Sequence, residues 1–317
     1  MAIGRTQKLL FSASGIFLCY LCFGVLQEHI TKSHYKLPDG SYELFVFPTS
    51  LVWVFCIINF LFAKLILSIR KQSEDTTRNL YYCMDALFYL LAMVCGNMSL
   101  QFISYPTHVV GKTIKPIFVM VLGVLLGKKQ YTFRKYCFVI LIISGATLFL
   151  YKDKGDSSMK KGLSLGFGEL LLFLSLIMDG FTAGIQERMI AEHQTKSLYL
   201  MLNLNKWAVV YAGSIILFTG EIFKFLEFVK RHPFIIGELL LLSVTSSCGQ
   251  FFIYTTVTEF GPLVCSIVAT LRKLFSVLVS VVFLGNTLMP RQWLATFIVF
   301  TGLFLDSYFG KSPSKSK

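Results

Sequence analysis

Residues 104–126 read SYPTHVVGKTIKPIFVMVLGVLL, an apolar run of helical length that carries two lysines in its first half. A stretch of about 20 apolar residues can span a bilayer as a helix, so Lys112 and Lys115 are expected inside the membrane. Positions three apart lie on one face of a helix. Each mid-span cation costs about 2.5–3.5 kcal/mol on insertion scales. The pair therefore predicts a water-filled interior or anionic partners.

The rest of the 317-residue chain is equally apolar, because 55% of its residues are hydrophobic and its mean hydropathy is +0.65. Only 15% are charged, whereas soluble domains carry about 25%. We expect an all-α polytopic membrane protein with ten transmembrane helices in the lipid bilayer. The expected spans are residues 9–29, 44–68, 80–103, 106–127, 134–151, 164–186, 198–219, 234–256, 261–284 and 291–309.

The net charge of +13 comes mostly from loops, where cations set topology and meet anionic lipid, so nucleic acid is not an expected partner. Ten spans place both termini on one side of the membrane. That side carries more loop Lys and Arg, with clusters at residues 70–78 and 128–135. By the positive-inside rule, both termini are expected in the cytosol.

The sequence also repeats itself at charged positions. Residues 105–152 align with 262–309, and FGVLQEHI (23–30) aligns with TAGIQERM (182–189) at nearly the same offset. The aligned pairs include Gln27 with Gln186, Glu28 with Glu187, Thr113 with Thr270, Lys115 with Arg272, Phe118 with Phe275, Arg134 with Arg291 and Gly145 with Gly302. Paired charged residues are less easily explained by chance than paired apolar ones.

We therefore expect two repeats of five helices, residues 1–152 and 153–317. Since five is odd, the second repeat is inverted relative to the first, and inverted repeats are common in transporters that bind substrate between the halves. In the ninth span, Arg272 and Lys273 lie at a depth similar to that of the first lysine pair. Doubled cations suit a polyanion, and phosphates fit best because Arg binds them bidentately and Lys binds as a point charge.

The alternative is that these cations form buried ion pairs that hold helices together. Acids within or near the expected spans are Glu28, Asp85, Glu169, Asp179, Glu187 and Glu238. Two of them, Glu28 and Glu187, follow Gln27 and Gln186 at the expected end of the first helix of each half. These four are candidate substrate-binding residues. Three roles are open for the glutamates. They pair with the lysines in the empty carrier, they hydrogen-bond a ribose or base together with the glutamines, or they cap solvated helix ends.

Pro116 has no backbone N–H, so a kink is expected beside Lys115, either for a moving helix or for packing. Motifs for chemistry are missing from the sequence. It holds no complete phosphate loop, no metal-binding His-Glu signature and no nucleophile elbow. No enzymatic activity, metal or cofactor is therefore expected.

Several stretches resemble the nucleotide-sugar transporters of solute carrier family 35, subfamily B, in the drug/metabolite transporter superfamily. They include GVLQEHIT, LQFISYPTHVVGKTIKPIFVM, GELLLFLSLIMDG, FGPLVCSIVATLRKLF and GLFLDSYFGK. The resemblance implies a carrier of the endoplasmic reticulum membrane, with the Golgi membrane as an alternative. It implies exchange of UDP-galactose, UDP-glucose or ATP for a lumenal nucleotide such as ADP. It places cavity cations on Lys112, Lys115, Arg272 and Lys273, and an acid on Glu28.

The competing functional class is a non-transporting membrane protein, such as a scaffold or a lipid-modifying enzyme. Its intramembrane charges would be structural ion pairs. The repeated cation pairs favour the carrier, because one pair is enough to lock two helices.

Overall fold

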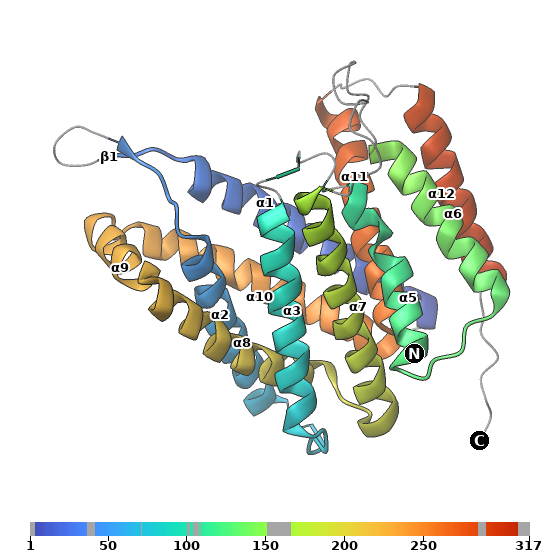
Figure 1. Cartoon of the computed structure of the whole chain (residues 1–317), viewed down its shortest axis with the longest axis horizontal. Coiled ribbons are helices and arrows are strands. Elements are labelled where there is room, and N and C mark those ends of the chain that lie inside the picture. Colours follow the sequence, from blue (N-terminus) through green and yellow to red (C-terminus); the bar gives the residue numbers. More distant parts are fainter. Residues whose placement is uncertain are drawn as a thin grey trace. The chain divides into compact units, whose positions relative to one another are not determined.

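The computed structural model describes residues 4–36, 42–70, 72–99, 102–103, 108, 110–150, 166–284 and 290–309. This part of the chain is almost entirely helical, apart from an antiparallel hairpin of β1 (Tyr35–Lys36) and β2 (Tyr42–Glu43) (Figure 1). The helices are α1 (Arg5–Lys32), α2 (Pro48–Ile69), α3 (Asn79–Ser99), the 3-10 helix η1 (Lys112–Ile114), α5 (Lys115–Leu125), α6 (Phe133–Leu150), α7 (Phe167–His193), α8 (Ser197–Thr219), α9 (Glu221–Arg231), α10 (Ile235–Phe260), α11 (Pro262–Leu284) and α12 (Pro290–Phe309). The linker between the expected repeats lies outside the described residues.

Six helices of the described part are long and apolar enough to cross a membrane, which confirms the prediction of an all-α polytopic protein. They are α1, α2, α3, α7, α8 and α10. The other expected spans fall on α5, α6, α11 and α12, and the count of ten stays a prediction. Several expected boundaries were wrong by four residues or more, since α1 already begins at Arg5 and α10 continues to Phe260. The second span begins at Pro48 because the hairpin precedes it, and the sixth runs to His193 because helical hydrogen bonding continues past the apolar run.

The chain forms two compact units, and residues 1–87 with 192–261 make up the first. Within it, α1 packs on α10, while α2 packs on α8 and α10. The amphipathic helix α9 was not expected from the sequence. Gly220 separates it from α8, as the C-cap of α8 and the N-cap of α9. The φ angle of Gly220 is +68°, a conformation that is easy for glycine and uncommon for other residues.

Phe228 on the inner face of α9 is fully buried in an aromatic cluster. Its ring centroid lies 5.0–5.7 Å from those of Tyr35, Phe45, Phe47 and His232. Burial raises the pKa of Tyr35 to about 12, so its hydroxyl stays neutral and donates a hydrogen bond to a main-chain carbonyl of α1 at 3.0 Å. The hairpin and α9 thus share one core.

Charged contacts hold the same helix at both ends. At its start, Glu221 accepts hydrogen bonds from the backbone N–H and the hydroxyl of Ser50, at 2.8 and 2.9 Å, in the first turn of α2. A carboxylate suits this place because the N–H groups of a first helical turn lack intrahelical acceptors. At the other end, Glu43 pairs with Arg231 at 3.0 Å and contacts Nε2 of His232 at 2.8 Å. These contacts fix α9 to α2 and to the hairpin.

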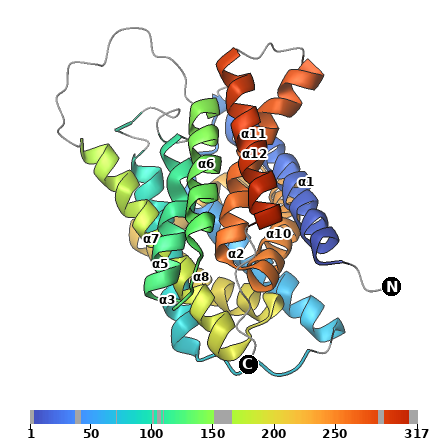
Figure 2. The same ribbon diagram turned by 90° about the vertical axis from the view of Figure 1, so that its right-hand side faces the viewer.

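Residues 88–191 and 262–317 form the second unit, in which α6 packs along α12, and α11 packs on α5 and α6 (Figure 2). The aligned glycines lie in the contact between α6 and α12. A Cβ atom on Gly145 would lie 2.8 Å from Val299, and one on Gly302 would lie 2.8 Å from Ile142. Ile142 and Val299 are themselves aligned by the repeat. The contact is therefore reciprocal, as in a two-fold interface.

Candidate functional site

Lys112 and Lys115 lie where a 3-10 helix is followed by an α-helix. Lys112 begins η1, and Lys115 begins α5 directly behind it. Pro116 has no N–H to donate to the carbonyl of Lys112, so that carbonyl accepts from the N–H of Lys115 in a 3-10 hydrogen bond. The sequence predicted a kink at Pro116, and the structure has this short 3-10 turn directly before that residue.

Two glycines let the backbone of α7 approach α5 closely (Figure 2). A Cβ atom on Gly180 would lie 2.9 Å from the carbonyl oxygen of Phe118, and one on Gly184 would lie 3.0 Å from that of Leu122. Small residues four apart are typical of close helix pairs in membranes. Asp179 precedes Gly180 in the chain, so the close approach brings this acid toward the lysines.

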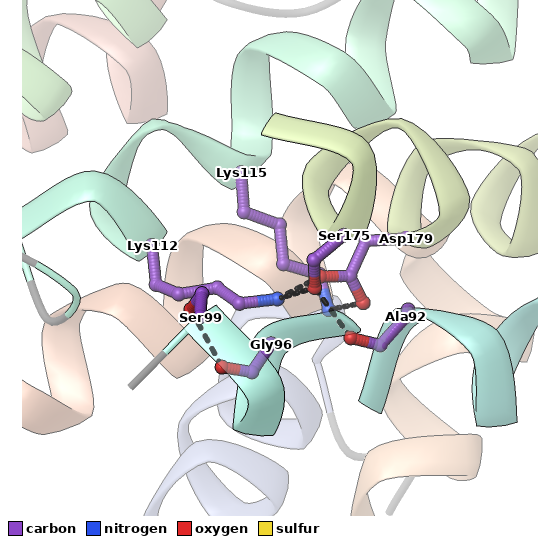
Figure 3. Close-up of polar contacts among 7 residues, drawn as sticks. All are labelled: Ala92, Gly96, Ser99, Lys112, Lys115, Ser175 and Asp179. Atoms are coloured by element: carbon purple, nitrogen blue, oxygen red, sulfur yellow. Dashed lines mark hydrogen bonds and ion pairs between the residues drawn. The ribbon is translucent and has the colours of Figure 1, made fainter. Parts of the chain in front are cut away.

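Asp179 bridges the two lysines (Figure 3). Nζ of Lys112 lies 2.8 Å from Oδ2, and Nζ of Lys115 lies 2.8 Å from Oδ1, so each carboxylate oxygen holds one ammonium group. The side chains of Asp179 and Lys112 are 12% and 17% exposed, whereas that of Lys115 is 38% exposed. An acid of the chain itself is thus the partner that the lysines have in this structure, and Lys115 is the more accessible cation.

Ser175, one turn before Asp179, gives Lys112 a second acceptor at 2.6 Å from Nζ. A serine hydroxyl has one proton, and Ser175 donates it to the carbonyl of Ala92 on α3, so its lone pairs are free for the ammonium group (Figure 3). Gly96 on α3 leaves room for this contact, because a Cβ atom there would lie 3.1 Å from Oγ of Ser175 and 3.6 Å from Nζ of Lys112. Three helices therefore hold one cation pair.

Two ammonium groups and one carboxylate leave this cluster with a net charge of +1. Moving ions out of water costs several kcal/mol per ion, and pairing with good geometry offsets this cost. A phosphate presents acceptor oxygens to ammonium groups much as a carboxylate does, and charge-assisted hydrogen bonds to either anion are strong. The cluster can therefore hold its own acid or an incoming phosphate oxygen.

The second predicted cation pair belongs to α11, which packs on α5 in the same unit. Arg272 is half-buried, and its neighbour Leu271 joins a core with Val119 and Met120 of α5. The side chain of Lys273 lies outside the described residues. The structure thus places both cation pairs on helices that contact each other.

Gln186 and Glu187 are buried on α7, two turns beyond Asp179. One of the three alternatives for Glu187, pairing with the intramembrane lysines, is not what the structure shows, because Glu187 forms an ion pair with Lys129, which follows α5. Position explains the difference. The helix carries Glu187 past the end of α5, beyond the reach of Lys112.

Gln27 and Glu28 lie on α1 in the first unit. Neither Glu28 nor Glu187 ends its helix, contrary to expectation, since α1 continues to Lys32 and α7 to His193. Within the described part of the chain, no group of three His, Cys, Asp or Glu side chains could hold a metal ion.

Two residues of the cluster, Asp179 and Ser175, were not among the predicted binding residues. An acid in an apolar run of helical length was the signal that pointed to Asp179, although five other acids shared it. Ser175 lies one turn earlier on the same helix face, but a serine within a span is too common to stand out.

Replacing Gly180 with alanine is expected to lower stability by about 1–3 kcal/mol, the usual cost of overpacking. The new Cβ atom would lie 2.5 Å from Leu122 and 2.9 Å from a backbone oxygen, so α5 must move away. Gly24→Ala is the matched control, since a Cβ atom there meets nothing within 4 Å and alanine favours a helix. The melting temperatures of the two purified variants test this, and equal values would contradict it.

Comparison with known proteins adds independent information. The UAA transporter family matches residues 8–310 of the chain. The chain is similar to "Solute carrier family 35 member B1" of Danio rerio, with 46% identity over 303 residues, covering 95% of this chain and 92% of that protein. It is also similar to the Gallus gallus protein of that name, with 47% identity over 304 residues (95% and 93% covered).

A similar likeness extends to an insect protein and to one solved structure. The chain is 44% identical over 315 residues to "Solute carrier family 35 member B1 homolog" of Drosophila melanogaster, covering 98% of this chain and 93% of that protein. A crystal structure with 10% sequence identity superposes with a TM-score of 0.67, covering 97% of this chain and 98% of that chain. At this identity the superposition reports the fold alone.

Proposed function

Since the chain belongs to the UAA transporter family, we propose that it is an antiporter that exchanges nucleotides or nucleotide sugars across a membrane. The candidate exchanges are ATP for ADP, and UDP-galactose or UDP-glucose for a uridine nucleotide. ATP, ADP and the UDP-sugars carry adjacent phosphates, which is the chemistry that paired cations recognise.

One observation carries this proposal. Lys112 and Lys115, from one helix face, converge on the two oxygens of a single anion at 2.8 Å each. A phosphate that takes the place of this carboxylate would meet two ammonium groups already in position. Arg272 is its proposed second contact, because α11 packs on α5 and the repeat aligns Arg272 with Lys115. Lys273 is assigned to the same role from the sequence.

The remaining predicted residues are assigned to the nucleoside end of the substrate. Gln27 and Glu28 occupy the same place in the first repeat as Gln186 and Glu187 in the second. Their amide and carboxylate groups suit the hydroxyls of a ribose and the polar edge of a base. The ion pair of Glu187 with Lys129 must then open when substrate arrives.

Ten spans in two inverted repeats of five are part of the same proposal. The reciprocal contacts of Gly145 with Val299 and of Gly302 with Ile142 support it, because an inverted repeat makes each contact twice. We assign the protein to the endoplasmic reticulum membrane, with both termini in the cytosol. The resemblance to subfamily B supports the compartment, and the loop charges support the orientation.

An uptake experiment tests the exchange. Proteoliposomes preloaded with ADP, UMP or no nucleotide are given labelled ATP or UDP-galactose from outside. Uptake is expected to be much faster into preloaded vesicles, because an anion neutralises the cation pairs before the carrier reorients. The preloaded nucleotide that gives the fastest uptake of label is the preferred exchange partner. Equal rates into empty and loaded vesicles would show uniport, and no uptake of either label would contradict a nucleotide carrier.

A further inference from the structure

We propose that Asp179 is a built-in counter-anion that occupies the phosphate position of the empty carrier and competes with the substrate. The inference rests on the proposed function, because it presumes that Lys112 and Lys115 bind phosphate. It adds a specificity-determining residue, whose charge sets how strongly phosphates are held and which of them are preferred.

The geometry favours competition over a simple lock. One carboxylate engages both ammonium groups, one through each oxygen (Figure 3). A phosphate that takes the place between the two ammonium groups must therefore displace a carboxylate oxygen. Lys112 is steadied by Ser175 at 2.6 Å, whereas Lys115 is 38% exposed. A substrate would reach Lys115 first and then displace Asp179 from the pair.

Charge makes the competition depend on the substrate. With Asp179 in place the cluster has a net charge of +1, and without it the net charge is +2. A displaced but nearby carboxylate also repels the phosphate that replaces it, and this repulsion grows with the charge of the ligand. Asp179 is therefore expected to weaken binding of triphosphates more than that of monophosphates.

The position of Asp179 is also fixed by the fold. Gly180 and Gly184 contact the backbone of α5. Asp179 directly precedes Gly180, so it has little freedom to move away from α5. Release of the lysines then requires rotation of the acid side chain or a shift of α7 along α5. Binding of phosphate is in this way linked to the packing of two helices.

The test is to measure the affinities of purified Asp179→Asn for AMP, ADP and ATP. The amide keeps the shape of the acid and removes its charge, so ADP binding should strengthen by about tenfold, equivalent to about 1.4 kcal/mol. The gain should rise from AMP to ATP. Asp306→Asn is the matched control, because Asp306 is a similarly buried acid of the same unit, paired with Lys135 at 2.6 Å. Asp306→Asn should leave the affinities for AMP, ADP and ATP unchanged.

A second comparison covers the case in which Asp179→Asn does not fold. Lys112→Gln leaves Asp179 and Lys115 to cancel each other, and adding Asp179→Asn restores the net charge of +1. The double variant should bind ADP about tenfold more tightly than Lys112→Gln alone. Unchanged or weaker ADP binding in both comparisons would overturn the counter-anion role.

The failure of this inference is distinguishable from failure of the proposed function. If Lys115→Ala weakens ADP binding and Asp179→Asn strengthens it in neither comparison, only the counter-anion role is overturned. If Lys115→Ala leaves ADP binding unchanged, phosphate does not bind at these lysines, and the assignment of the phosphate site falls together with the counter-anion role. Nucleotide exchange itself is overturned only by the uptake experiment.

Discussion

Replacing Lys115 with alanine is expected to weaken nucleotide binding by about ten- to hundredfold, while the protein remains folded in the membrane. A hydrogen bond to a charged group contributes about 1.5–3 kcal/mol, and each 1.4 kcal/mol is about a factor of ten in affinity. Lys115 is suited to the test because its side chain is the most exposed of the cluster. Its loss therefore costs less packing than the loss of Lys112.

Arg272→Ala should have an effect of the same order, since Arg272 occupies the equivalent place in the second repeat on a helix that packs on α5. Binding is measured by titration of purified protein, with the melting temperature recorded on the same sample. Lys135→Ala is the matched control. It removes a buried lysine paired with Asp306 at 2.6 Å, so it should lower the melting temperature and leave affinity unchanged. Normal affinity with a large loss of stability in Lys115→Ala would mean that the lysines are structural.

The sequence predicted the lysine pair and its helix because these depend on local pattern alone. Apolar runs of helical length marked the spans, and Pro116 marked the irregular turn. The repeat alignment also anticipated that Lys115 and Arg272 are equivalent, and the structure places them on adjoining helices of one unit. The equivalence itself stays a prediction.

The partner of the lysines could not be chosen from the sequence in the same way. Six acids lay within or near the spans, and spacing along the chain does not tell which helix lies beside α5. That choice is made by tertiary packing, through the glycines of α7 that fit the backbone of α5. The sequence does contain the signal, since Gly180 directly follows Asp179 and Gly184 lies four residues further along. Only the structure shows that α5 is the helix they face.

The amphipathic helix α9 was missed for a different reason. It has 11 residues, too few to register in a search for membrane-spanning runs of about 20. Its apolar residues Ile222, Phe225, Phe228 and Val229 follow the helical period, which indicates one buried face. The sequence therefore contains the pattern of an amphipathic helix that was not recognised, and the partners of its buried face are distant in the chain.

Removal of the Phe228 ring is expected to lower the stability of the first unit by about 3–5 kcal/mol, the usual cost of changing a buried Phe to alanine. Phe228 is fully buried, and its ring lies against those of Tyr35, Phe45, Phe47 and His232. The cavity left by Phe228→Ala would separate α9 from the hairpin. The contacts of Glu43 with Arg231 and His232 would then hold an unsupported helix end.

Phe223→Ala is the matched control, because it makes the same chemical change on the same helix at a side chain that is 70% exposed. Exposed substitutions usually change stability by less than about 0.5 kcal/mol. Thermal unfolding of both variants in the same detergent separates burial from helix propensity, which the two substitutions alter equally. A large loss for Phe228→Ala alone would show that burial of the aromatic cluster holds α9 on the hairpin. Equal losses would mean that α9 contributes through its helical backbone, and that the cluster around Phe228 is not what fixes it.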